Sequence, residues 1–123
     1  MILDDIKSFL LERNIIQEEY VKFDYDSSKG EETVLLHLYD NVPCDLARRS
    51  SIKITIKFGD LKLARDTAFA LHDLFFPEDS FQKSIKINEK TMHAKLNKGP
   101  FYQGKDQSKR HNYVLDITLT YNR

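Results

Sequence analysis

The chain has 123 residues, of which 41% are hydrophobic and 31% are charged, and its formal net charge is zero. We expect one domain over residues 1–123, large enough to enclose a single core. No run of about 18 apolar residues occurs, so we expect neither a membrane-spanning helix nor an export signal. Cys44 is the one cysteine, which excludes an internal disulfide and favours a reducing compartment.

The balanced total conceals an uneven distribution of charge along the chain. Residues 1–46 hold eleven acidic and four basic side chains, whereas residues 47–123 hold fifteen basic and eight acidic ones. Two interpretations stay open at this point. Either the two halves mix in the folded domain, or they form opposite poles that suit head-to-tail contact between copies of the chain.

The first third of the chain predicts one helix followed by strands. Residues 2–14 have the spacing of an amphipathic helix whose apolar side consists of Ile2, Leu3, Ile6, Phe9 and Leu10. Strands are expected at 20–25 and 33–39, joined as a hairpin by the turn-forming residues 26–30. The segment 41–45 contains Pro43, which lacks a backbone donor and is expected to interrupt the strand pattern.

The middle of the chain predicts a strand, a helix and two further strands. Residues 51–58 alternate between apolar and polar side chains, and Asp60 is a suitable N-cap for a helix over 61–75. Short strands follow at 84–88 and 91–97. This order of elements predicts an α+β fold, with an antiparallel or mixed β-sheet and two helices packed on one of its faces.

The stretch 98–121 carries the clearest indication of function. It opens with Gly99 and Pro100, continues with the aromatic residues Phe101 and Tyr102, and passes through a polar loop that reaches residue 112. It ends in a strand over 113–121 whose apolar and polar side chains alternate. A loop with exposed aromatic side chains, anchored by a long strand, is typical of a contact surface rather than a reaction centre.

Signals of catalysis are missing from the sequence. The histidines have no metal-binding spacing, and neither a GxSxG pattern nor a Cys–His pair is present: the four are His37, His72, His93 and His111. The four glycines form no phosphate-binding loop. We therefore expect no enzyme activity, no metal and no cofactor.

Binding of nucleic acid is a separate hypothesis. Between Ser80 and Tyr113 eight basic and two acidic residues accompany Phe101 and Tyr102, so residues 83–110 could contact phosphates while the aromatic rings stack on bases. The same lysines are also expected on the exposed side of a hairpin, where they discourage unwanted strand pairing.

The layout of the chain carries a resemblance. A helix MILDDIKSFLLERN comes first, and a strand SIKITIKFGD leads into a helix LKLARDTAFALHDLF. The end of the chain adds a glycine-proline, aromatic, Gly-x-Asp, basic and final-strand pattern at Gly99, Pro100, Phe101, Gly104, Asp106, Arg110 and Tyr113. In this order of elements the sequence resembles the minor capsid or tail terminator (tail completion) proteins of tailed bacteriophages.

The resemblance implies a non-enzymatic phage or prophage protein that caps the tail tube and joins it to the head. It implies a ring, expected to be a hexamer, whose partners are copies of itself, the tail tube protein and a head-completion or connector protein, with DNA passing through the lumen. The expected location is the head–tail joint of the virion, after synthesis in the bacterial cytoplasm. A head-completion or connector component is the related alternative.

For the assembly interface we expect five residues in the terminal segment: Phe101, Tyr102, Asp106, Lys109 and Arg110. The aromatic rings would serve as desolvated anchors, and the charged groups would set the register of the contact. The loop 98–112 would be mobile in the free subunit and become ordered against a neighbour or the tube.

Overall fold

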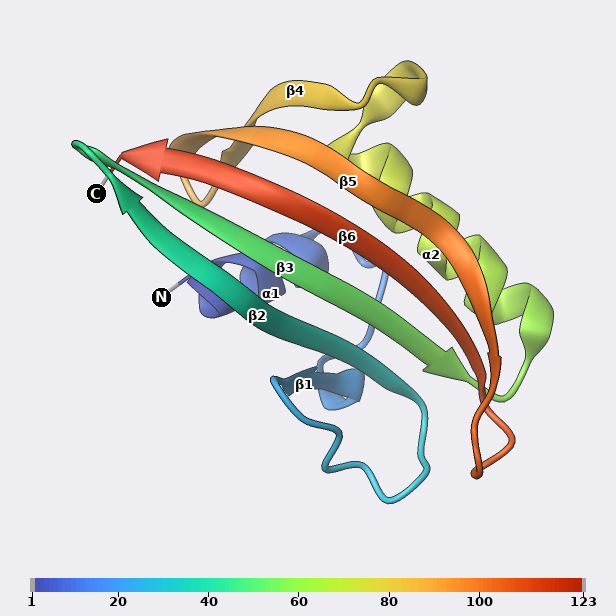
Figure 1. Cartoon of the computed structure of the whole chain (residues 1–123). Coiled ribbons are helices and arrows are strands. Elements are labelled where there is room, and N and C mark those ends of the chain that lie inside the picture. The colour runs from blue at the N-terminus through green and yellow to red at the C-terminus, as the bar shows by residue number, and fades with distance from the viewer. Residues whose placement is uncertain (1, 123) are drawn as a thin grey trace.

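The computed structural model describes residues 2–122, which form a six-stranded sheet with two α-helices on one face (Figure 1). The α+β class expected from the sequence is confirmed. The elements, in chain order, are α1 (Ile2–Glu12), η1 (Glu18–Tyr20), β1 (Val21–Phe23), β2 (Thr33–Cys44), β3 (Ala47–Phe58), α2 (Leu61–Phe75), η2 (Pro77–Asp79), β4 (Gln82–Ile87), β5 (Lys90–Lys105) and β6 (His111–Asn122).

The strands lie in the order β1-β2-β3-β6-β5-β4 across the sheet. Helix α2 carries the chain away from β3 at the centre, β4 and β5 then form the far side, and β6 returns to pair with both β3 and β5. As a result the N-terminal strands lie at one edge of the sheet and β4 lies at the other.

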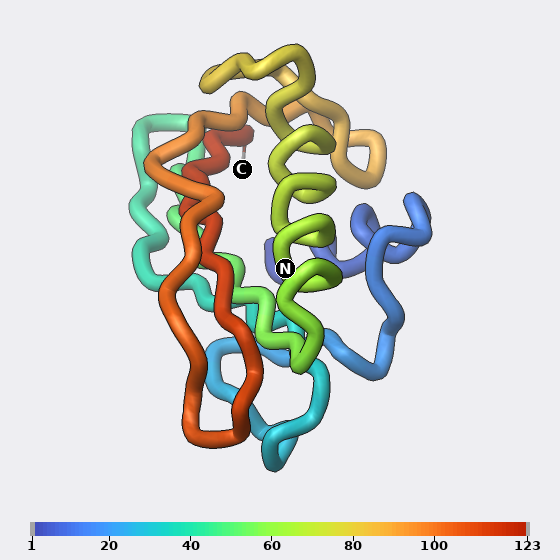
Figure 2. The backbone as a smooth tube through the Cα atoms, turned by 90° about the vertical axis from the view of Figure 1, so that its right-hand side faces the viewer, coloured from blue at the N-terminus to red at the C-terminus, as the bar shows by residue number. Residues whose placement is uncertain are grey.

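Both helices bury their apolar sides against the same face of the sheet, as the side view in Figure 2 shows. They meet where the rings of Phe9 and Phe75 lie 5.6 Å apart. Asp60 begins α2 because its carboxylate accepts a hydrogen bond from the Leu63 amide, 3.1 Å away. The opposite face of the sheet carries no helix from the described residues and is called the open face below.

The expected hairpin between 20–25 and 33–39 is wrong, because β1 pairs with β2 in parallel, with Val21 opposite Val34. The residues between these strands do not make a tight reversal. They form a longer loop, which contacts Arg110 and returns the chain to the other end of the sheet before β2 begins. A parallel pair needs such a return connection.

The expected interruption at 41–45 is also wrong, since β2 continues to Cys44 and Pro43 pairs with Arg48. Strand β1 pairs with β2 at residues 34–36, so the later part of β2 is an edge of the sheet. Proline is tolerated there because an edge position needs no ladder donor on its outer side.

The third correction concerns the loop expected at 98–112. Strand β5 runs through to Lys105, and the connection to β6 is the short turn 106–110. Three register shifts along the β5–β6 pair accommodate the stretch that contains Gly99, Pro100 and Gly104. The glycine-proline break therefore lies within a bulged strand rather than at the start of a loop.

Candidate functional site

The five residues expected at an interface all lie at one end of the β5–β6 hairpin, but the structure divides them between different surroundings. Phe101 and Tyr102 lie near the end of β5, Asp106 and Lys109 belong to the turn, and Arg110 immediately precedes β6.

The two aromatic residues point to opposite faces of the sheet. Phe101 lies opposite Val114 on the open face, half-buried, with the ammonium of Lys98 5.7 Å from its ring centre. Tyr102 lies opposite Tyr113 on the face that carries the helices, and its hydroxyl is 2.8 Å from Nδ1 of His111. Because successive side chains in a strand alternate between faces, the two rings cannot belong to one flat contact patch.

Arg110 is buried, with 6% of its surface exposed, and is fully engaged inside the molecule. Its guanidinium donates to carboxylate oxygens of Asp26 at 2.7 Å and Asp106 at 2.9 Å, and to the hydroxyls of Ser28 and Thr33 at 3.1 Å each. We call these five residues the Arg110 cluster. It fixes the turn of the β5–β6 hairpin to the loop between β1 and β2.

Within the turn, one oxygen of Asp106 accepts hydrogen bonds from the amides of Ser108, at 2.9 Å, and Arg110, at 3.0 Å. The expectation that Asp106 and Arg110 contact a neighbouring subunit therefore needs correction, because both use their charges to hold the hairpin together. Lys109 remains an exposed charged residue at the turn.

The protonation of the cluster follows from these contacts. Burial alone would raise the pKa of Asp26, but hydrogen bonds from Ser28 and Arg110 and the positive charge of Arg110 outweigh it and hold the pKa well below its usual range. Burial likewise opposes, and Arg110 again overcomes, the shift at Asp106, whose pKa is lowered. Both carboxylates therefore stay ionised wherever the protein is folded at neutral pH.

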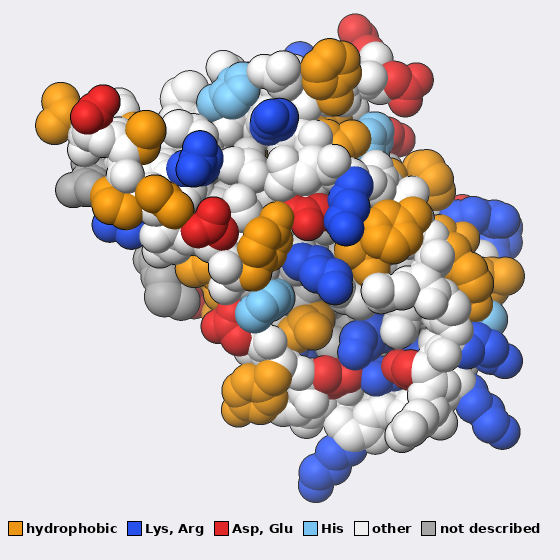
Figure 3. Space-filling view, in the orientation of Figure 1, with side chains coloured by type: hydrophobic (Ala, Val, Ile, Leu, Met, Phe, Trp, Pro, Cys, Tyr) orange, Lys and Arg blue, Asp and Glu red, His pale blue; other side chains and the backbone are white. Residues whose placement is uncertain are grey.

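The open face is a polar surface centred on Asp116, which is 7% exposed (Figure 3). Asp116 accepts hydrogen bonds from the Tyr39 hydroxyl at 2.7 Å and the Asn97 amide at 3.0 Å. Burial raises the pKa of Tyr39, and the neighbouring carboxylate raises it further. With these donors in place, Asp116 organises the surface and is poorly suited to accept a proton from a substrate.

Two shallow hollows on the open face meet at Tyr39. One is lined by Arg49, His93 and Lys95, among others, and the second by Lys53, Lys98 and Phe101 together with Asp116. Sequence reasoning recognised Phe101 and the lysines but missed Tyr39 and Asn97. The available signal was Asp116 itself, the one acidic side chain on the polar side of the final strand.

The two edges of the sheet carry opposite charge. Residues 17–32, around β1, include six carboxylates and two lysines, whereas residues 80–98, around β4 and the start of β5, include five lysines and one glutamate. Glu78 and Asp79 of η2 stand just before the second group. Each edge also presents an exposed aromatic side chain, Tyr25 (73% exposed) beside β1 and Phe81 (64% exposed) before β4.

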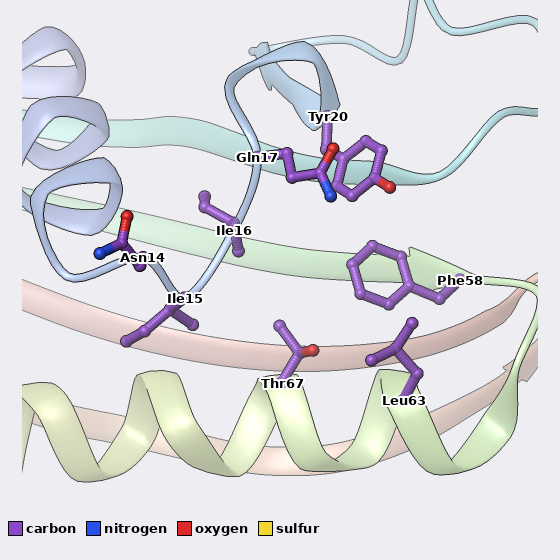
Figure 4. Close-up of a pocket in the computed structure, with 8 residues that line it drawn as sticks. All are labelled: Asn14, Ile15, Ile16, Gln17, Tyr20, Phe58, Leu63 and Thr67. Atoms are coloured by element: carbon purple, nitrogen blue, oxygen red, sulfur yellow. The ribbon is translucent and has the colours of Figure 1, made fainter.

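A groove of about 280 Å³ lies beside the acidic edge, between α2 and the segment that leads into β1 (Figure 4). Its walls are mostly apolar, with two amide side chains, and they are formed by Asn14, Ile15, Ile16, Gln17, Tyr20, Phe58, Leu63 and Thr67. Figure 4 shows Ile16, Phe58, Leu63 and Thr67 directed towards a common space. Glu18 and Glu19 are part of the same segment and are exposed.

Other kinds of site are not formed by the described residues. Within residues 2–122, no group of three or more His, Cys, Asp or Glu side chains is placed to hold a metal ion. In the same range, no helix is both long and apolar enough to cross a membrane.

Comparison with known protein families finds no family model that matches the sequence, and comparison with curated proteins finds no match either.

Proposed function

We propose that this chain is a non-enzymatic subunit of a ring that closes the tail of a tailed bacteriophage or prophage and joins it to the head. The observation that carries the proposal is the opposite charge of the two sheet edges. A ring is built by a heterologous contact, in which one surface of each subunit meets a different surface of the next. Opposite charges on those surfaces steer the contact, while two like edges repel each other.

The terminal segment gives independent support. Its resemblance to tail terminator proteins implies a sheet with helices on one face, and the fold is of that kind. On this proposal the partners are the neighbouring subunits, the tail tube protein and a head-completion or connector protein. The site of action is the head–tail joint of the virion.

The mass of the purified protein in solution tests the proposal. Light scattering over a range of concentrations at low salt is expected to show association of the 14.5 kDa chain towards a closed ring, for which six subunits are expected. In the phage or prophage that carries the gene, its deletion is expected to leave heads and tails unjoined in electron micrographs. Joined particles in normal number would overturn the proposal.

A second function is favoured by one specific feature, the cluster of Arg49, Lys53, Lys95 and Lys98 around Phe101 on the open face. Such a surface suits the phosphates and bases of a nucleic acid. Retention on single- or double-stranded DNA that falls steeply as salt rises, without self-association, would favour this alternative. A connector component of the same virion joint is separated from a tail terminator by which partner, connector or tail tube, it binds.

A further inference from the structure

We propose that the groove beside the acidic edge receives the side chain of Phe81 from a second copy of this chain. The proposal rests on the proposed ring function, which requires a contact between unlike surfaces, and it names those two surfaces.

The groove has the size and lining of a receptor for one aromatic ring. Its volume is about 280 Å³, and a cavity of about 150 Å³ lined by apolar side chains accepts benzene. Phe58 and Thr67 are buried at its base, whereas Leu63 is 51% exposed on its wall. Covering Leu63 with an incoming ring would remove apolar surface from water.

Phe81 has the properties of the matching anchor. Its side chain is 64% exposed, while its backbone carbonyl accepts a hydrogen bond from the Leu96 amide at 2.8 Å. The backbone is thus held at the edge of the sheet, and the ring is presented to solvent from a fixed position. Aromatic side chains on rigid backbone are typical anchors of protein interfaces because they bury a large area at little entropic cost.

The charges around the two surfaces are complementary. Glu18 and Glu19 lie in the segment that forms one wall of the groove, and Lys83 and Lys86 follow Phe81 on β4. The lysines also discourage two copies of β4 from pairing with each other, while leaving β4 free to approach an acidic surface. Since the groove lies at one edge and Phe81 at the other, every subunit can use both surfaces, as a ring requires.

Leu46 is the alternative anchor, being 86% exposed in the turn between β2 and β3. Leucine is a less common interface anchor than an aromatic residue, and Leu46 directly follows Asp45, whose charge has the same sign as Glu18 and Glu19. Leu46 therefore supplies a matched control rather than the proposed contact.

The test uses two single substitutions at exposed positions, Phe81→Asp and Leu63→Asp, with Leu46→Asp as the control. Each variant is checked for folding by circular dichroism, and its mass is measured by light scattering at concentrations where the wild type associates. Phe81→Asp and Leu63→Asp are each expected to remain monomeric, and Leu46→Asp to associate like the wild type. An equimolar mixture of the first two is expected to form a dimer, since one intact groove and one intact Phe81 remain between them.

The outcomes separate this inference from the proposed function. Association of Phe81→Asp and Leu63→Asp at wild-type strength would overturn the inference and leave the ring intact, as would loss of association in Leu46→Asp alone. A mixture of Phe81→Asp and Leu63→Asp that stays monomeric would contradict the pairing of these two surfaces. A wild type that is monomeric at every concentration would overturn both the self-assembled ring and this contact.

Discussion

At the scale of single residues, Arg110 holds together two loops that are far apart in the chain. Its guanidinium has five N–H donors in a rigid plane, which suits it to several acceptors at once. Asp26 and Asp106 supply the charge, and Ser28, Thr33 and the Glu31 carbonyl take further donors. The end of the β5–β6 hairpin therefore owes its position to a buried network rather than to a partner subunit.

Replacing Arg110 by Met is expected to lower the free energy of unfolding by roughly 3 kcal/mol, because removing one member of a buried ion pair leaves the other uncompensated. Arg110→Lys keeps the charge but loses the planar fork, so an intermediate loss is expected. Urea unfolding at pH 7 measures both. Equal stability of Arg110→Met and the wild type would show that the network contributes nothing net.

The same cluster predicts a dependence of stability on pH. The pKa values of Asp26 and Asp106 are lowered in the folded protein from the ordinary 3.8, so the unfolded chain binds more protons as the pH falls below about 4. Their contribution to stability is present above that pH and is lost on acidification. Urea unfolding between pH 5 and pH 2.5 is expected to show a shallower decline in Arg110→Met than in the wild type. Parallel declines would contradict this assignment.

At the scale of elements, β5 shows how a strand can contain residues that usually end one. Gly99 has a φ of +96°, and an added Cβ atom would overlap the carbonyl oxygen of Val114 on the neighbouring strand. Gly104 also has a positive φ, of +106°, but a Cβ atom there would meet nothing within 4 Å. The two glycines thus meet different requirements, one for close approach of β5 to β6 and both for the backbone angle.

Substitution by alanine separates these requirements. Gly104→Ala is expected to cost about 1–2 kcal/mol, the usual cost of a left-handed conformation for a residue with a Cβ atom. Gly99→Ala is expected to cost more, since β6 must also move away. Thermal unfolding of both variants provides the measurement, and the expectation fails if Gly104→Ala is the more damaging substitution.

At the scale of the whole molecule, the strand order converts a difference along the chain into a difference across space. The acidic first third supplies β1 and β2 at one side of the sheet, and the basic segment supplies β4 and β5 at the other. Ion pairs such as Asp26–Lys57 and Asp5–Lys90 cross between the halves, yet each edge keeps an excess of one sign. The molecule is therefore suited to association with copies of itself in a single orientation.

Reversal of charge at the two edges tests this arrangement. The double variants Glu18→Lys/Glu19→Lys and Lys83→Glu/Lys86→Glu are each expected to weaken self-association at low salt, and combining all four substitutions is expected to restore much of it. Lys105→Glu/Lys109→Glu changes the net charge as Lys83→Glu/Lys86→Glu does, but at the hairpin end, and is expected to leave association unchanged. If the combined variant is weaker than either double variant, the edges do not face each other.

Local periodicity was enough to predict α1, α2, β3 and the final strand, because each of these elements buries one side in the core and repeats that demand along its own residues. The direction of β1, the continuation of β2 past Pro43 and the strand conformation of 98–105 depended on which strands lie alongside, and no local pattern records that. The same holds for function-related residues. Arg110 and Asp26 are 84 positions apart in the sequence, so an exposed loop charge and a buried ion pair look alike until the fold brings them together.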